Sequence, residues 1–308
     1  MSSIGIDFGG TTIKSGLVEN GQIVCRAAPI DTQALGGPKE IVDAMVNLVG
    51  FYGEHGTAIT AMGIGLPGLI NQTTGIVHEL TNVPGWDEVP LRKILKERTG
   101  LPVTIENDAK AMAYGEWKYG AAQNGRDVVC VTLGTGVGGA LILDGRIYRG
   151  ANHAAGEIGH MSIDYRGRPG PYGTFGGFEE YIGNQQITER AAERYRAAGR
   201  EMTLEQCTPR RLSEMAGAGD PIAKQMWDDL GDELGAALAS VVWIINPDTI
   251  VIGGGVAKAG ELLFEPARRS IRSRTSDVIH TNLRVVAAAL GNDAGIIGSA
   301  TLALDSLG

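Results

Sequence analysis

The chain has 308 residues, of which 43% are hydrophobic and 20% charged, and its formal net charge at pH 7 is −8. This length suits two domains, and the acidic balance argues against a general nucleic-acid surface, which needs a basic face. The three cysteines are widely spaced, so no disulfide framework or cysteine-rich metal motif is implied. No signal peptide or membrane-spanning apolar run is found, and we expect a cytoplasmic enzyme without membrane contact.

The first part of the chain alternates predicted strands with predicted helices. Asn20-Gly21, between two short apolar runs, is typical of a hairpin turn. Apolar residues at helical spacing predict a helix over 38–54, and Gly100 marks the end of another. The expected strands span residues 4–8, 13–18, 23–30, 61–66 and 103–105, and the expected helices span 38–54, 91–99 and 109–119.

A second set of elements follows a Gly/Ala/Asn-rich connector at 120–126, which we interpret as a lobe boundary. It starts with a strand, a glycine loop and a returning strand, as the first part does. The expected strands span 128–133, 139–143, 146–148, 249–252 and 283–287, and the expected helices span 184–198, 209–216, 220–245, 258–273 and 291–304. The pattern predicts an α/β protein with mixed sheets in two lobes, 1–119 and 120–292, and a C-terminal helix within 293–308 that packs back on the first lobe.

Two loops of glycine and threonine follow apolar strands about 125 residues apart. Such loops expose backbone N–H groups without Cβ obstruction, which suits them to phosphate oxygens. The first matches neither the P-loop nor the dinucleotide-binding spacing, and a hairpin turn without a ligand is the alternative interpretation. Two such loops indicate a nucleotide held between two lobes. The candidate phosphate-binding residues are Asp7, which suits a hydrated Mg²⁺, with Gly9, Gly10, Thr11, Thr12 and Lys14, and Gly134, Thr135 and Gly136 in the second loop.

Three further groups of residues are candidates for chemistry. Asn107 and Asp108, after a predicted strand, suit either a helix cap or a general base. Glu157, His160 and Glu179 lie among glycines and suit sugar hydroxyls, with a solvated charged loop as the alternative. Gly254 and Gly255 suit a close approach to adenine, with helix–sheet packing equally open.

Together these pieces resemble the ROK family of sugar kinases and repressors, and within it the bacterial glucokinases. The resemblance covers nearly the whole chain, in order and spacing. The motifs that carry it are the opening Asp7 to Lys14, Gly65-Leu66-Pro67-Gly68, Asn107-Asp108, Leu133 to Gly139, Glu157-Ile158-Gly159-His160, and Asn246-Pro247 leading to Gly253-Gly254-Gly255.

The resemblance implies an actin-like (ribonuclease-H-like) two-lobe ATPase fold with ATP and Mg²⁺ as cofactors. It implies that Asp108 takes the proton from the 6-hydroxyl of glucose and that Asp7 lies near the Mg²⁺. It carries Asn107, Glu157, His160 and Glu179 over as ligands of the other hydroxyls, with the Gly68 backbone and Asn82 lining the sugar pocket. A homodimer is common among the relatives.

One departure concerns a structural zinc that this family often holds with His160 and three cysteines. The corresponding positions here are Gly170, Tyr172 and Gly177. One imidazole does not make a four-ligand zinc site, so we expect no zinc. We expect packing of Tyr172, Phe175 and Phe178 to hold the loop instead. Zinc-free relatives include users of polyphosphate, which stays open as a donor.

Other functions also stay open at this point. The sugar could be fructose, mannose, allose or an N-acetylhexosamine, because hydroxyl stereochemistry cannot be inferred from a motif. A sugar-sensing repressor would carry an added helix-turn-helix domain. This chain starts directly on the Asp7 strand and keeps Asp108, which favours the kinase over a repressor or a silent sugar-binding protein.

Overall fold

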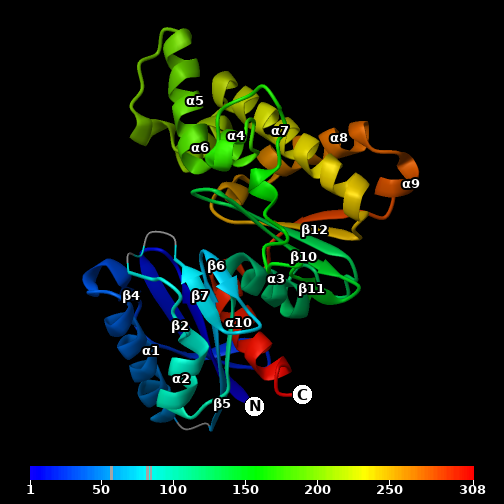
Figure 1. Cartoon of the computed structure of the whole chain (residues 1–308). Helices are drawn as coiled ribbons and strands as arrows, with labels where there is room; N and C mark the ends of the chain where they lie inside the picture. Colours follow the sequence, from blue (N-terminus) through cyan, green and yellow to red (C-terminus); the bar gives the residue numbers. More distant parts are fainter. Residues whose placement is uncertain (56–57, 81–82, 84) are drawn as a thin grey trace. The chain divides into compact units, whose positions relative to one another are not determined.

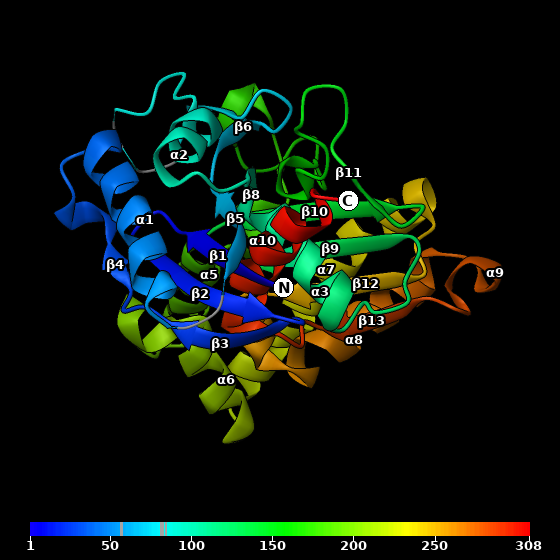
Figure 2. The same cartoon turned by 90° about the horizontal axis from the view of Figure 1, so that it is seen from below.

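The computed structural model (Figures 1 and 2) describes residues 1–55, 58–80, 83 and 85–308. By its contacts, the chain divides into two compact units. Unit 1 consists of Met1–Asn124, Arg146–Ala155 and Ala289–Gly308, and unit 2 consists of Gly125–Gly145 and Gly156–Ala288. Residues 146–155 lie in the second predicted lobe, and by contacts they group with unit 1, although residues 146–148 are hydrogen-bonded to a strand of unit 2. As domain bounds, 1–119 and 120–292 stay a prediction.

Unit 1 is built on a mixed sheet with the strand order β3-β2-β1-β5-β8. Strand β1 is antiparallel to β2 and parallel to β5, which is parallel to β8. The strands are β1 (Ser2–Phe8), β2 (Thr12–Glu19), β3 (Gln22–Arg26), β5 (Ile59–Leu66) and β8 (Val103–Asn107), with β4 (Ile30–Asp31) paired to β2.

Two details of this sheet test the sequence predictions. Asn20 and Gly21 both have positive φ, 48° and 76°, so the predicted hairpin turn is confirmed. The single strand predicted over 23–30 is wrong, because the chain leaves the ladder after Arg26 and re-enters it as β4 at Ile30. Pro29 lies in this break and has no backbone N–H to donate.

Helices cover both faces of the unit 1 sheet (Figure 2). One face packs with α1 and α2 in a core that includes Ile6, Met45 and Leu91. The opposite face packs with α10, which in turn packs on α3. The helices are α1 (Pro38–Gly53), α2 (Leu91–Thr99), α3 (Asp108–Tyr119) and α10 (Ala294–Asp305), with short η1 (Thr32–Ala34) and η6 (Gly291–Asp293). The unit also holds the hairpin β6 (Leu69–Asn71) and β7 (Ile76–Glu79), which was not predicted. Strand β11 (Arg146–Tyr148) groups with unit 1 by its contacts, but its ladder hydrogen bonds place it in the second sheet.

The backbone of α10 lies almost directly on the sheet. A Cβ added to Gly5 of β1 would lie 1.9 Å from the carbonyl oxygen of Ile296, and one added to Gly63 of β5 would lie 1.8 Å from that of Ser299. Both distances are far shorter than any van der Waals contact, so only glycine fits at these two strand positions.

Unit 2 repeats the strand arrangement of unit 1. Its sheet has the strand order β11-β10-β9-β12-β13, in which β11 is hydrogen-bonded to β10. The other strands are β9 (Val128–Leu133), β10 (Val137–Leu143), β12 (Thr249–Gly253) and β13 (Arg284–Ala287). Strand β9 is antiparallel to β10 and parallel to β12, which is parallel to β13, as β1 is to β2, β5 and β8. The predicted α/β class with a duplicated mixed sheet is therefore confirmed.

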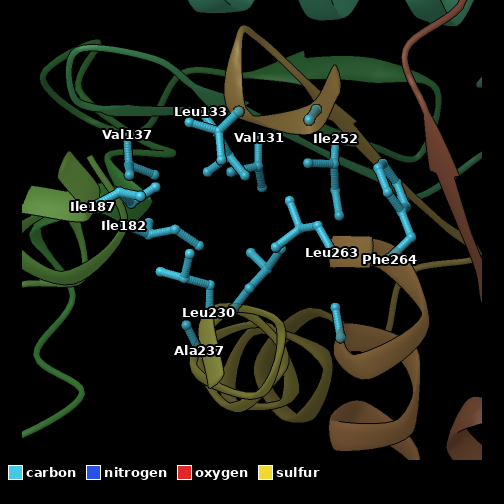
Figure 3. Packing of buried hydrophobic residues seen from close by; sticks show 14 of the residues in the cluster. Val131, Leu133, Val137, Ile182, Ile187, Leu230, Ala237, Ile252, Leu263 and Phe264 are labelled. Carbon is cyan, nitrogen blue, oxygen red and sulfur yellow. The ribbon is translucent and has the colours of Figure 1, made fainter. Parts of the chain in front are cut away.

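Long helices form the other layer of unit 2. Figure 3 shows Val131, Leu133 and Ile252 of the strands facing Leu230 of α7, with Leu263 and Phe264 of α8 beside them. The predicted helix start at 258 is wrong by three residues, because Gly260 has a φ of 62° and α8 begins at Glu261. The helices are η2 (Ile158–His160), η3 (Pro171–Gly173), α4 (Glu179–Ile182), α5 (Asn184–Ala197), η4 (Leu204–Cys207), α6 (Pro209–Gly217), α7 (Pro221–Ile245), η5 (Val256–Ala259), α8 (Glu261–Arg274) and α9 (Asp277–His280).

Within residues 1–55, 58–80, 83 and 85–308, no helix combines the length and the apolar character needed to cross a bilayer.

The close packing of α10 predicts a steep cost for the smallest enlargement of Gly63. The variant Gly63→Ala should lose about 3 kcal/mol of unfolding free energy, because the α10 backbone must move away from the sheet. Gly50→Ala is the matched control: no atom lies within 4 Å of its added Cβ inside α1, and it should gain about 0.5–1 kcal/mol. Urea denaturation measures both, and equal stability of the two variants would contradict the packing argument.

Candidate functional site

The candidate residues of unit 1 gather at one edge of its sheet. Asp7 of β1 lies in register with Gly65 of β5, and Gly65 lies in register with Glu106 of β8. The carboxyl ends of these three parallel strands therefore lie at one edge of the sheet. Asp7 lies at that edge near the end of β1, and Asn107 and Asp108 lie there at the end of β8. Ligands of open α/β sheets bind at this edge.

Asp7 lies beside the start of α10. A Cβ added to Gly295 in the first turn of α10 would lie 2.9 Å from the Asp7 carboxyl carbon. Burial raises the pKa of Asp7 to about 6, Lys14 opposite it on β2 opposes this effect, and Asp108 adds to it. A carboxylate held at such a cost is suited to a cation, and the positive end of the helix dipole also favours its charge.

The loop between β1 and β2 has the form expected of a phosphate cradle. The Gly9 N–H donates to the carbonyl of Thr12 at 2.9 Å, which closes the turn. Thr32 holds the loop from behind, since its hydroxyl donates to the Gly10 carbonyl and its N–H to the Thr11 carbonyl. The N–H groups of Gly10 and Thr11 donate to no acceptor within the described part of the chain, so they are available to an anion.

Asn107 and Asp108 begin helix α3. Asn107 is the N-cap, and its side-chain oxygen accepts from the Lys110 N–H at 3.2 Å. Asp108 is the first residue of the helix, and its carboxylate accepts from the Ala109 N–H at 2.8 Å. Burial raises the pKa of Asp108, while these backbone hydrogen bonds and the charge of Lys110 oppose the shift. The helix cap is thus Asn107, and the carboxylate of Asp108 beside it stays a candidate general base.

Lys110 is an unexpected feature of this site. Its side chain is only 1% exposed, and no carboxylate among the described residues lies within ion-pair distance of its ammonium group. A lysine is rarely buried without a partner. Its charge therefore acts on Asp108, two residues away.

Gly68 lies just beyond the end of β5. Its φ is 98°, and an added Cβ would lie 2.4 Å from the carbonyl oxygen of Glu79, so no larger residue fits there. Asn82, the other residue expected to line the sugar pocket, lies outside the described residues.

The glycine loop of unit 2 adjoins the glycines that follow β12. The Gly134 N–H donates to the Gly136 carbonyl at 2.9 Å, and the Asn184 N–H at the start of α5 donates to the Gly134 carbonyl at 2.9 Å. A Cβ added to Gly254 would lie 2.2 Å from the carbonyl oxygen of Leu133. Unit 2 thus brings together Gly134, Thr135, Gly136 and Gly254, with Gly255 following.

Glu179 links this loop to His160. One carboxylate oxygen of Glu179 accepts from the Val137 N–H at 3.2 Å, and the other lies 4.0 Å from His160 Nδ1. Glu157, at the start of η2, is exposed, and within the described chain its carboxylate has no hydrogen-bond or ion-pair partner. The three predicted sugar ligands thus comprise one contacting pair and one free carboxylate.

The loop that replaces the cysteine motif is held differently from our expectation. Phe178 is fully buried, but Tyr172 is 89% and Phe175 53% exposed, so the predicted packing of all three is wrong. Backbone hydrogen bonds hold the loop instead, including the Ile163 N–H to the Gly176 carbonyl at 2.8 Å. Among the residues that the structure describes, no group of three or more His, Cys, Asp or Glu side chains could hold a metal, and a zinc-free protein stays a prediction.

Two buried carboxylates, Glu106 directly before Asn107-Asp108 and Glu116 in α3, have partners that the sequence did not predict. Glu106 is 4% exposed and pairs with Arg149, and Glu116 is fully buried and accepts from the backbone N–H groups of Ala121, Ala289 and Leu290. A glutamate in an apolar context was the only signal, and neither set of partners could be inferred from spacing.

Comparison with known proteins gives matches along nearly the whole chain. A family model described as the ROK family matches residues 3–306. The glucokinase of Streptomyces coelicolor is 33% identical over 314 residues, which cover 98% of this chain and 97% of that protein. The glucokinase of Thermotoga maritima is 32% identical over 311 residues, covering 99% and 98%.

A solved structure agrees with these matches. The crystal structure of a ROK family glucokinase from Streptomyces griseus in complex with glucose and AMPPNP has a TM-score of 0.82 and 33% identity, and covers 99% of this chain and 100% of that chain. ROK sugar kinases have the actin-like ATPase fold, so the predicted fold is confirmed.

The raised pKa of Asp7 predicts that the protein without metal is destabilised by this charge as pH rises. The folded state disfavours the ionised carboxyl, so its cost begins above the unfolded pKa of 3.8 and is complete above about 6. The free energy of unfolding of the variant Asp7→Asn should therefore exceed that of the wild type by about 3 kcal/mol at pH 7.5 and by only about 1 kcal/mol at pH 4.5. Chemical denaturation in EDTA at both pH values tests this, and a difference independent of pH would contradict it.

Proposed function

Because this chain belongs to the ROK family, we propose that it phosphorylates glucose, transferring the γ-phosphoryl group of ATP to the 6-hydroxyl. The observation that carries the proposal is the pair of half-buried carboxylates, Asp7 and Asp108, at adjoining strand ends beside a loop with free N–H groups. Similarity to glucokinases over the length of the chain supports the same assignment.

In this proposal Asp108 is the general base. It accepts the proton of the 6-hydroxyl while that oxygen bonds to the γ-phosphorus and the bond from phosphorus to the bridging oxygen of ADP breaks. Burial raises its pKa, which makes it a better proton acceptor than an exposed aspartate. The charge of the nearby Lys110 opposes this rise in the Asp108 pKa.

In this proposal the two glycine loops bind the phosphate groups of ATP. In unit 1 the free N–H groups of Gly10 and Thr11 and the hydroxyls of Thr11 and Thr12 would bind them, with Lys14 nearby. In unit 2 the Gly134-Thr135-Gly136 loop would do the same, with Gly254 and Gly255 against adenine. Asp7 would hold Mg²⁺ through water, and the bound ion supplies charge neutralisation for the triphosphate.

The remaining hydroxyls of the sugar would bind to Asn107, Glu157, His160 and Glu179. The Gly68 backbone and Asn82 would line the sugar pocket. The 4.0 Å separation of His160 and Glu179 supports their joint use, because each can bind a different oxygen of one sugar. Homodimer formation is also proposed.

A coupled assay tests this proposal. The protein should release ADP in the presence of glucose, ATP and Mg²⁺, and labelled ATP should yield a 6-phosphorylated sugar. A panel of fructose, mannose, allose and N-acetylhexosamines, each with ATP and with polyphosphate, ranks the substrates and donors. Absence of sugar phosphate at millimolar glucose would overturn the proposal.

Replacement of the base separates chemistry from binding. Asp108→Asn should lower kcat by about 10²- to 10⁴-fold, because the proton acceptor is lost. Glucose affinity, measured by calorimetry, should change little. Asp43→Asn, at a half-exposed position of α1, is the control and should keep wild-type kinetics. Near-normal turnover by the Asp108 variant would exclude it as the base.

A further inference from the structure

A short segment of unit 1 is inserted between two parts of unit 2. By contacts, the chain leaves unit 2 after Gly145, groups with unit 1 over residues 146–155, and returns to unit 2 at Gly156, while β11 within this segment keeps its hydrogen bonds to β10. We refer to residues 146–155 as the strap. Ile147 of the strap packs against Ala111 and Tyr114 of α3 and Leu302 of α10. The strap is therefore seated on the helix that begins with Asp108.

An ion pair fixes the middle of the strap. Two nitrogens of the Arg149 guanidinium donate to one oxygen of Glu106, Nε at 2.8 Å and a terminal nitrogen at 2.7 Å. The Glu106 side chain is 5% exposed and that of Arg149 27%. The Arg149 carbonyl accepts from the Ala155 N–H at 3.0 Å, which closes the strap on itself just before Gly156.

The second oxygen of Glu106 points to the candidate base. It accepts from the N–H of Asn107 at 3.1 Å. Asn107 then caps α3, whose first residue is Asp108. A continuous series of contacts thus runs from the Arg149 guanidinium through Glu106 to the two residues that carry the proposed chemistry.

We infer that Arg149 and Glu106 are positioning residues for sugar phosphorylation, a role that rests on the proposed function. They tie the strand end that presents Asn107 and Asp108 to the strap, which continues directly into Gly156 and the sugar ligand Glu157. The sugar hydroxyl that Asp108 deprotonates and the hydroxyl that Glu157 binds belong to one rigid ring. The positions of the Asp108 and Glu157 carboxylates must therefore both match the geometry of this ring.

The chemistry of the pair favours this role over simple packing. A buried ion pair stabilises a fold little more than apolar residues of the same shape would, and it leaves a costly charge when one partner is lost. The planar guanidinium, with two donors on one oxygen, fixes direction as well as distance. A displacement of about 1 Å in a reacting group can cost 10²-fold in rate.

The test compares four variants of the full chain with the wild type. Arg149→Met should lower kcat by about 10- to 100-fold and raise the KM for glucose, while the KM for ATP stays within about twofold. Arg149→Lys keeps the charge but not the two-donor geometry, and should recover part of kcat. Because Arg149→Met leaves a buried charge, the double variant Glu106→Gln/Arg149→Met guards against failure to fold and should show the same loss.

The matched control is Arg98→Met. Arg98 pairs with Asp43 between α2 and α1 of the same unit, and both side chains are half-exposed. It should keep wild-type kinetics. Circular dichroism reports folding, and calorimetry with glucose should show binding weakened about tenfold in the double variant.

The inference is overturned if the folded double variant has a kcat and a glucose KM within about twofold of the wild type. It is also overturned if activity loss follows only the unfolded fraction, because a structural role alone predicts that result. An inactive wild type would overturn the proposed function itself, so the two failures are distinguishable.

Discussion

The close approach of α10 to the sheet of unit 1 is the constraint on which this site depends. Backbone meets backbone where Gly5 and Gly63 face Ile296 and Ser299, and any side chain there would separate the layers. This contact brings the start of α10 to Asp7. The last helix of the chain thereby sets the surroundings of one of its first residues, and the electrostatics of the strand edge follow from that packing.

Burial raises the pKa values of the Asp7 and Asp108 carboxyl groups and also makes their ionised forms costly to the stability of the fold. Asp7 and Asp108 both have raised pKa values, chiefly because they are withdrawn from water, and each is partly compensated by a lysine. Such groups reduce the stability of the protein alone and interact strongly with a cation or a substrate proton. Burial also makes Lys110 effective, since its charge is not screened by solvent.

The buried carboxylates of Glu106 and Glu116 hold segments of the chain that lie near the passages between the two units. Glu116 accepts N–H groups from residue 121 and from residues 289 and 290, and Glu106 holds Arg149. These contacts lie beside the places where the chain passes between the units, after residues 124, 145, 155 and 288. Each carboxylate oxygen of Glu106 and Glu116 thereby has a hydrogen-bond partner. Through these two residues, β8 and α3 hold the chain segments that connect unit 1 to unit 2.

Features that depend on local geometry and on motif spacing could be predicted from the sequence. The hairpin at Asn20-Gly21, the helix over 91–99, the repeated strand–glycine loop–strand and the family were all predictable, because turn residues, apolar periodicity and short motifs act over a few positions. The exposure of Tyr172 and Phe175, the break before β4 and the partners of Glu106 and Glu116 were not. These features depend on tertiary packing, because burial and ion pairing join residues such as Glu106 and Arg149, which lie far apart in the sequence.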